Sequence, residues 1–296
     1  MKKKLFAIGL AAVMVFAMTA CGGSSTSSSS SAAADSSADS SASTTSEKVS
    51  GDLYVSAAAS MTESLDKVIA EFEKENPDCK VTPTYDSSGT LKTQIQQGSP
   101  CDVFISAAQK QMDQLDGESD QNEGTNYVLK GTRVDLLENT CVLVVSPDNK
   151  AGIKNWDDFT NAIKNAKSSD DLIFCMGNSD VPVGQYTSQI LTNLGLNEQD
   201  MANAGIVTYG SNVKEVTSQV QSGAADCGII YSTDAFSAGM KPAATADSKL
   251  TGGPITYPAA VMQNTQNKEA AQAFMDFIQT DKAMKEFKAV GFKAVK

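Results

Sequence analysis

The chain has 296 residues, a formal net charge of −11 and no histidine. An acidic chain repels nucleic acid at long range, which argues against that class of partner. Without histidine it cannot form a Ser-His-Asp triad, and with a single arginine, Arg133, it has no arginine cluster with which to bind an anion.

The first residues have the pattern of an export signal. Lysines at positions 2–4 precede an apolar run over residues 5–18, which is shorter than the about 20 residues of a membrane-spanning helix. We therefore predict a signal peptide over residues 1–20. The segment Met18-Thr19-Ala20-Cys21 resembles the lipobox of bacterial lipoproteins, which implies lipid on Cys21 and an extracytoplasmic protein anchored to the cell membrane. An ordinary secretory signal with an incidental cysteine is the alternative.

Residues 21–50 are expected to form a lipidated, disordered tether rich in serine and alanine. No large apolar side chain occurs between Cys21 and Val49. Such a segment cannot bury enough apolar surface to offset its chain entropy. The globular part is therefore predicted to cover residues 51–296.

Strand-like and helix-like segments alternate along this globular part. Apolar runs predict strands over residues 53–57, 81–85, 103–105, 141–145, 173–176, 206–209 and 227–231. Helical spacing predicts helices over residues 65–72, 91–95, 182–194, 213–220 and 270–278, the last of which is expected to belong to the core. This alternation predicts an α/β protein with parallel sheets, whose ligand site lies beyond the carboxyl ends of the strands.

Four predicted strand-to-helix junctions carry hydrogen-bond donors. The motifs are Ser60-Met61-Thr62-Glu63, Ser87-Ser88-Gly89, Val181-Pro182-Val183-Gly184 and Asn212-Val213-Lys214-Glu215. The first and last have the capping-box pattern, the second has a glycine that permits close backbone approach, and the third has a proline suited to a first helical turn. Any one of them alone is explained by helix initiation. Together they predict a receptor that binds an oxyanion with hydroxyls and helix N-termini.

Five segments along the globular part match a known family. They are Ala57-Ala58-Ala59-Ser60, Ser87-Ser88-Gly89-Thr90-Leu91, Gln97-Gly98-Ser99-Pro100-Cys101-Asp102-Val103-Phe104-Ile105-Ser106-Ala107, Val181-Pro182-Val183-Gly184-Gln185-Tyr186 and Gly228-Ile229-Ile230-Tyr231-Ser232-Thr233-Asp234-Ala235. In these segments the chain resembles the molybdate-binding proteins of bacterial ABC importers. The resemblance implies a two-lobed fold of the type II periplasmic-binding-protein class. One lobe would comprise residues 51–139 and 255–296, and the other residues 140–254, with a hinge between them.

The resemblance also implies ligand contacts and partners. The contacts would be the hydroxyl and amide of Ser60 and Ser88, the backbone amides of Val183 and Val213, and the phenol of Tyr231. The ligand would be molybdate or tungstate, so molybdenum would be bound as an oxyanion and not as a free metal cation. The partners would be the permease of the transporter and, through the lipid on Cys21, the membrane. A monomer without cofactor or enzymatic activity is expected.

The chain departs from the family pattern at three places. A polar stretch over residues 116–126 is expected to lengthen a surface loop, Gly89 replaces a usual serine, and Asp86 stands where a small neutral residue is expected. An all-donor site suits a fully ionised tetrahedral anion, whereas phosphate near neutral pH keeps a proton and needs an acceptor. Asp86 would supply that acceptor if it pointed inward; otherwise it caps a turn or faces solvent. Sulfate and phosphate therefore remain alternative ligands.

Other interpretations stay open at this point. An exported serine hydrolase would need a base for its serine, for instance Lys92 one helical turn after Ser88, and an adhesive surface module would need neither base nor ligand. The remaining cysteines show no CxxC or zinc-type spacing, and four of the five lie in or beside apolar runs. They are expected to be small core residues, with pairing outside the cell as the alternative. These residues are Cys79, Cys101, Cys141, Cys175 and Cys227.

Overall fold

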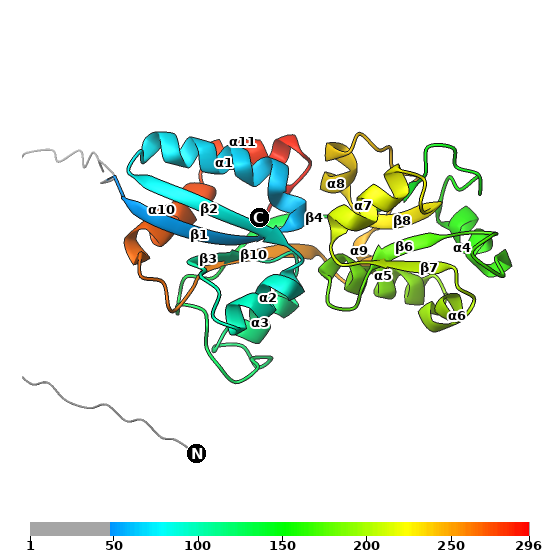
Figure 1. Cartoon of the computed structure of the whole chain (residues 1–296), viewed down its shortest axis with the longest axis horizontal. Coiled ribbons are helices and arrows are strands. Elements are labelled where there is room, and N and C mark those ends of the chain that lie inside the picture. Colours follow the sequence, from blue (N-terminus) through cyan, green and yellow to red (C-terminus); the bar gives the residue numbers. More distant parts are fainter. Residues whose placement is uncertain (1–47, 296) are drawn as a thin grey trace, which may run out of the picture. The chain divides into compact units, whose positions relative to one another are not determined.

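The computed structural model describes residues 48–295. The predicted signal peptide, the lipidation of Cys21 and the tether up to residue 47 lie outside the described residues. The described part forms two β-sheets, each with its own helices (Figure 1). We call the half built on the six-stranded sheet the first lobe and the half built on the five-stranded sheet the second lobe.

The first lobe has strands in the order β11-β4-β10-β3-β1-β2. These strands are β1 (Gly51–Ala58), β2 (Cys79–Asp86), β3 (Val103–Ile105), β4 (Val134–Asn139), β10 (Ile255–Val261) and β11 (Lys293–Ala294). The helices are α1 (Thr62–Glu75), α2 (Ser88–Gln96), α3 (Gln109–Leu115), α10 (Lys268–Ile278) and α11 (Asp281–Ala289), with a 3-10 turn, η1 (Ala59–Met61), before α1. In Figure 1, α1 and α11 lie above the sheet, and α2 and α3 lie below it.

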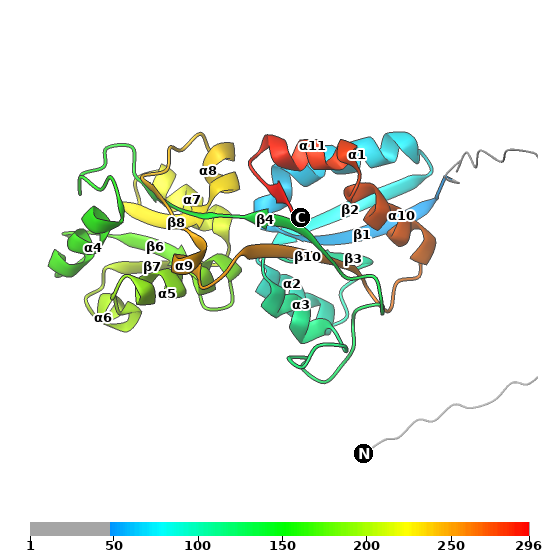
Figure 2. The ribbon, with the colours of Figure 1, turned by 180° about the vertical axis from the view of Figure 1, so that it is seen from behind.

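The second lobe has strands in the order β7-β6-β8-β5-β9. These strands are β5 (Cys141–Val145), β6 (Phe174–Gly177), β7 (Val207–Gly210), β8 (Cys227–Tyr231) and β9 (Ala244–Thr245). The helices are α4 (Trp156–Asn165), α5 (Pro182–Asn193), α6 (Glu198–Asn203), α7 (Val213–Gln221), α8 (Ser232–Ser237) and α9 (Ser248–Thr251). Helices α7 and α5 cover opposite faces of this sheet (Figures 1 and 2).

The strands and helices that the sequence predicts are all present, with ends shifted by a few residues. A glycine lies two residues after the last residue of both α2 and α5. Gly98 has a φ of 89° and Gly195 a φ of 69°, backbone conformations that side chains with a Cβ rarely adopt. The polar stretch over residues 116–126 lies in the connection between α3 and β4, which contains neither a helix nor a strand of its own.

The expectation of parallel sheets is met only in part, because both sheets are mixed. Strand β1 pairs in parallel with β2 and β3, and β6 with β7 and β8. Strand β10 is antiparallel to β3 and β4, and β5 is antiparallel to β8. The reason is the path of the chain between the lobes. Strand β10 enters from the second lobe at the edge where β1 and β3 end, so it runs in the opposite direction (Figure 2).

Aromatic packing joins the helices on one face of the first lobe. The ring of Phe72 in α1 lies edge-on to Phe274 and Phe277 in α10, with centroid distances of 5.1 and 5.4 Å. The predicted core role of residues 270–278 is therefore confirmed. The core role of the cysteines is also confirmed for the four that are buried. Among the described residues all five are free thiols, with Cys101 half-buried and Cys79, Cys141, Cys175 and Cys227 buried.

Candidate functional site

One small cavity between the two lobes brings together all the ligand contacts that the resemblance implies. The cavity itself has a volume of about 10 Å³, and all the space between the lining atoms, open solvent included, is about 200 Å³. The lining residues come from the carboxyl ends of β1, β2, β3 and β8 and from the first turns of α2, α5 and α7, as expected for an α/β protein. They are Ala58, Ala59, Ser60, Asp86, Ser87, Ser88, Ala107, Val181, Pro182, Val183, Val213 and Tyr231.

Ser60 does not form the capping box that its sequence motif suggests. The 3-10 turn η1 carries the chain past Ser60, and α1 begins only at Thr62, with no side chain capping its first N–H groups. The Ser60 hydroxyl instead lies 2.8 Å from the phenol oxygen of Tyr257. Ser60 is therefore a buried residue of the cavity wall and not the start of a helix.

Ser88 is the first residue of α2, and the preceding Ser87 caps the helix. Ser87 Oγ accepts from the N–H of Thr90 at 3.1 Å. Ser88 Oγ accepts from the backbone N–H of Ala107 at 2.9 Å. Because that N–H can only donate, the hydroxyl proton of Ser88 is available to a ligand.

Two helices of the second lobe begin at the cavity. Helix α5 begins with Pro182, and α7 is capped by Asn212, whose Oδ1 accepts from the N–H of Glu215 at 3.1 Å. The Glu215 carboxylate reaches back to the N–H of Ser211, one residue before the position that a capping box uses. The N–H groups of a first turn have no acceptor within the helix. The amides of Val183 and Val213 therefore lie at two positive helix ends.

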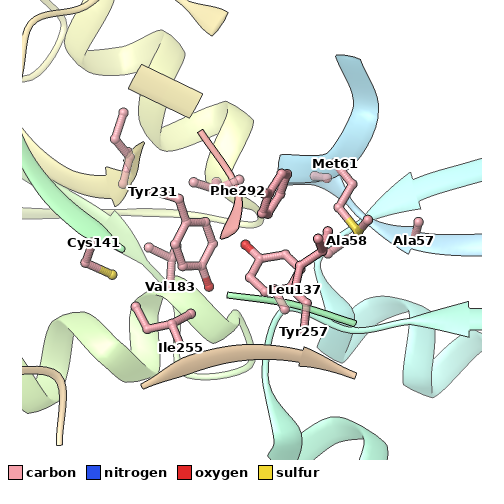
Figure 3. Packing of buried hydrophobic residues seen from close by; sticks show 14 of the residues in the cluster. Ala57, Ala58, Met61, Leu137, Cys141, Val183, Tyr231, Ile255, Tyr257 and Phe292 are labelled. Atoms are coloured by element: carbon pink, nitrogen blue, oxygen red, sulfur yellow. The ribbon is translucent and has the colours of Figure 1, made fainter. Parts of the chain in front are cut away.

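Tyr231 carries a buried phenol without a protein partner. Its side chain is 1% exposed, and among the described residues its oxygen accepts and donates no hydrogen bond. Burial raises the pKa of Tyr231 well above its ordinary value, so the phenol keeps its proton. Its ring lies 5.8 Å from that of Tyr257, centroid to centroid, and Figure 3 shows the two side by side. A buried hydroxyl left unpaired costs about 1–3 kcal/mol, which makes Tyr231 a donor in need of an acceptor.

The two lobes touch directly beside the cavity. Asp86 in the first lobe accepts from the N–H of Ser87 at 2.7 Å and from Nδ2 of Asn212 in the second lobe at 3.3 Å, so it both caps a turn and joins the lobes. A Cβ at Gly89 would lie 2.1 Å from the carbonyl oxygen of Asp180. The glycine thus permits the close approach of the second lobe's backbone. The sequence predicts a close backbone approach at this glycine but not its partner.

A charged cluster forms a second link between the lobes. The ammonium of Lys214 in α7 lies 2.7 Å from the Glu63 carboxylate in α1 and 3.1 Å from that of Asp234 in α8. Asp234 is 1% exposed. Burial raises its pKa to about 6, although Lys214 acts in the opposite direction. Sequence reasoning missed this cluster, because its members are far apart in the chain.

The structure does not support a catalytic pair at Ser88. The ammonium of Lys92 lies 2.9 Å from the carboxylate of Glu123, and Arg133 is paired with Asp113 and Asp116. In the part of the chain that the structure describes, no cluster of three potential metal ligands occurs. Over residues 48–295 no helix is long and apolar enough to cross a membrane.

Comparison with known proteins gives a family match and several relatives. A family model described as bacterial extracellular solute-binding protein matches residues 53–293. YvgL of Bacillus subtilis, which carries the provisional name of an ABC transporter substrate-binding lipoprotein, is 33% identical over 82% of this chain and 86% of its own length. The molybdate-binding protein ModA of Haemophilus influenzae is 32% identical over 83% of this chain and 91% of its own length. The solved periplasmic molybdate-binding protein of Azotobacter vinelandii has 26% identity and a TM-score of 0.69, and the match covers 82% of this chain and 100% of that one.

The charged cluster generates a prediction about stability. Lys214→Met leaves the buried Asp234 without its cation, which for a buried pair costs about 3 kcal/mol or more. The unfolded carboxyl ionises near its ordinary pKa and the folded one only at a higher pKa, so stability falls as the pH rises between the two. We expect the loss in the unfolding free energy to be large at about pH 8 and small at about pH 5, as measured by urea titration.

A matched control is Lys282→Met. Lys282 pairs with Glu71 and Glu75 on the surface, so its loss is expected to change stability little at either pH. Equal losses for the two variants, or a Lys214→Met loss that does not depend on pH, would show that Asp234 needs no partner.

Proposed function

We propose that this chain, which belongs to the bacterial extracellular solute-binding protein family, binds molybdate in the cavity between its lobes and delivers it to an ABC importer. As a solute-binding protein it is a binding component of transport and not an enzyme. The observation that carries the proposal is the set of donors that converge from both lobes. Two serine hydroxyls, the first turns of two helices and the unpaired phenol of Tyr231 surround one small cavity.

This donor set matches the chemistry of a tetrahedral dianion. Molybdate, like tungstate, presents four oxygens that only accept, so every donor of the cavity can be satisfied by it. Hydrogen bonds to an ionised acceptor are about twice as strong as bonds between neutral groups. Among residues 48–295, neither lysine nor arginine lines the cavity. The positive ends of α5 and α7 and the oriented hydroxyls would therefore stabilise the anion.

Burial of the site strengthens these bonds. Four of the five implied contact residues are 3% exposed or less, and Val213 is 4% exposed. With water excluded, the effective dielectric constant is low and each dipole acts more strongly on the anion. The contacts between Asp86 and Asn212 and between Glu63 and Lys214 hold the lobes together around the cavity in this arrangement.

The names of the relatives support the remaining parts of the proposal. The Haemophilus influenzae and Azotobacter vinelandii proteins bind molybdate by name, and YvgL is named as a lipoprotein. We accordingly infer an extracytoplasmic protein that residues 1–20 export and that lipid on Cys21 attaches to the membrane. We also propose that the protein is a monomer and that it binds tungstate, which presents the same four acceptor oxygens as molybdate. Its lobes would be residues 51–139 with 255–296, and residues 140–254.

One observation favours a second candidate ligand, hydrogenphosphate. The Asp86 side chain belongs to the cavity lining, and a carboxylate is the acceptor that a protonated phosphate needs. Against this, Asp86 Oδ1 already accepts from Ser87 and Asn212. Sulfate is fully ionised like molybdate, so only the size of the cavity distinguishes the two.

The proposed function predicts which oxyanions stabilise the folded chain. Molybdate and tungstate should each raise the melting temperature, and a ligand at about a hundred times its Kd should add about 2.7 kcal/mol to the free energy of unfolding. Thermal melts with molybdate, tungstate, sulfate and phosphate measure this. A shift with phosphate alone, which Asp86→Asn abolishes, would replace molybdate by hydrogenphosphate, and equal shifts with sulfate would contradict selection by size.

Tyr231→Phe tests the phenol as a donor. The change keeps the ring and removes one unpaired hydroxyl, so the unfolding free energy without ligand should stay within about 1 kcal/mol. Loss of a hydrogen bond to an ionised ligand costs about 1.5–3 kcal/mol, so molybdate affinity should fall more than tenfold in calorimetric titrations. Ser88→Ala is expected to lose a similar factor. A Tyr231→Phe protein with lower stability and unchanged affinity would assign Tyr231 a purely structural role.

A further inference from the structure

We propose that Asn139 and Tyr257, neither of which lines the cavity, are positioning residues that direct the hydroxyl proton of Ser60 toward the ligand. The inference rests on the proposed function, because it concerns how the oxyanion site is prepared. It follows from a chain of buried hydrogen bonds between the hinge and the cavity, in which Asn139 contacts Tyr257 and Tyr257 contacts Ser60.

The orientation of the Asn139 amide is fixed by its neighbours. Its Oδ1 lies 2.8 Å from the backbone N–H of Thr140, which can only donate, and 3.0 Å from the hydroxyl of Ser232. The other amide atom must therefore be the NH₂ group. This group donates to Thr233 Oγ1 at 2.9 Å and to the phenol oxygen of Tyr257 at 3.1 Å.

The amide in turn fixes the proton of Tyr257. An NH₂ group has no acceptor site, so the phenol oxygen accepts from Asn139 and must place its own proton elsewhere. The other partner of this oxygen is Ser60 Oγ at 2.8 Å. Burial raises the pKa of Tyr257 well above its ordinary value, so the phenol is protonated and donates to the serine.

Ser60 is therefore left with its proton free for the cavity. Its oxygen accepts from Tyr257, just as Ser88 Oγ accepts from the backbone N–H of Ala107. Both serines thus act as donors to the cavity. Ser88 does so because a backbone N–H donates to its oxygen, and Ser60 does so because the side chains of Asn139 and Tyr257 orient it. Each serine oxygen uses one of its two lone pairs in this way and keeps its proton for the ligand, so it faces the cavity first as a donor, which suits an ionised oxygen better than the proton of hydrogenphosphate. The pair Asn139 and Tyr257 would therefore contribute to selectivity as well as to affinity.

Through its position, Asn139 links the orientation of the Ser60 hydroxyl to the second lobe. It is the last residue of β4, where the chain leaves the first lobe, whereas Ser232 and Thr233 belong to α8 of the second lobe. Asn139 is 7% exposed and Tyr257 is fully buried, so water does not compete for these bonds. The orientation of a donor in one lobe thus depends on contacts with the other.

A double-mutant cycle with molybdate as the probe tests the proposal. Tyr257→Phe removes the donor to Ser60, and we expect the affinity to fall about threefold to tenfold. In a Ser60→Ala background the same change should alter the affinity less than about twofold, because no hydroxyl is left to orient. The matched control is the Ser88→Ala background, where the full loss should reappear. Equal losses in all three backgrounds would overturn the proposal and leave Tyr257 a structural residue.

Asn139→Asp should reverse the direction of the hydrogen bonds from Asn139 through Tyr257 to Ser60. A carboxylate in place of the NH₂ group would accept from Tyr257, so that Ser60 would donate to Tyr257 and turn its lone pairs to the cavity. We expect weaker binding of molybdate and a smaller preference for molybdate over phosphate than in the unmodified chain. In the Ser60→Ala background the preference should not change on this substitution. An unchanged preference with Ser60 present would overturn the proposal.

Neutron diffraction makes the test independent of the ligand's identity. In deuterated crystals we expect the deuteron of Tyr257 to lie on the line to Ser60 Oγ. A deuteron on Ser60 that points to Tyr257 would overturn the proposal even if molybdate binds. Conversely, a chain with no affinity for any oxyanion but with the expected deuteron would refute the proposed function and leave the hydrogen-bond chain standing.

Discussion

The proposed function depends on one electrostatic constraint: an anion taken out of water must be compensated, and where no opposite charge lines the site, dipoles must compensate it. Burying an ionised group without compensation is prohibitive, and the cavity offers no lysine or arginine. In the proposed site the compensation would come from hydroxyls and from backbone N–H groups at helix starts. Both sheets place the ends of their strands at this point, so that Ser60, Ser88, Val183, Val213 and Tyr231 meet although they span most of the chain.

A site divided between two lobes ties binding to their contact. Neither lobe alone supplies all the proposed donors, so a ligand would gain its full set of bonds only where both lobes line the cavity, as they do here. Gly89 leaves room for the carbonyl of Asp180, and Lys214 reaches across to Glu63. The close approach of Asp180 accounts for a glycine at position 89, where the family resemblance predicts a serine. A side chain at this position would meet the backbone of the opposite lobe in the arrangement described here.

Much of the fold follows from local patterns, and the exceptions have physical causes. Apolar runs and helical spacing predict β1, β2 and α1 correctly, because the buried face of a strand or helix determines which nearby residues are apolar. Strand β10 is not among the predicted strands, and Pro258 in its middle lacks the N–H that a central strand usually donates. The structure accommodates this proline with a shift of register between Tyr257 and Pro258. The antiparallel pairing of β10 results from the path of the chain between the lobes, and no local sequence pattern predicts it.

The residues of the candidate site are likewise predicted from the sequence, whereas their hydrogen-bond partners are not. Hydroxyls and helix starts are visible as motifs, and the resemblance to a family places them in one site, but their partners are remote. Tyr257 lies 197 residues from Ser60 and 118 from Asn139, so no spacing in the sequence links them. The motif at Ser60 favours a helix cap. In the structure a 3-10 turn precedes the helix instead, and the Ser60 hydroxyl contacts Tyr257.

The central claim is that dipoles from both lobes hold a molybdate ion in this cavity. Crystals grown with molybdate and measured at the molybdenum absorption edge would locate the metal by its anomalous scattering. The account predicts a single strong peak in the cavity, with oxygens within hydrogen-bond distance of the hydroxyls of Ser60, Ser88 and Tyr231 and of the amides of Val183 and Val213. Molybdenum bound elsewhere on the chain, or a cavity without it at saturating molybdate, would contradict the account.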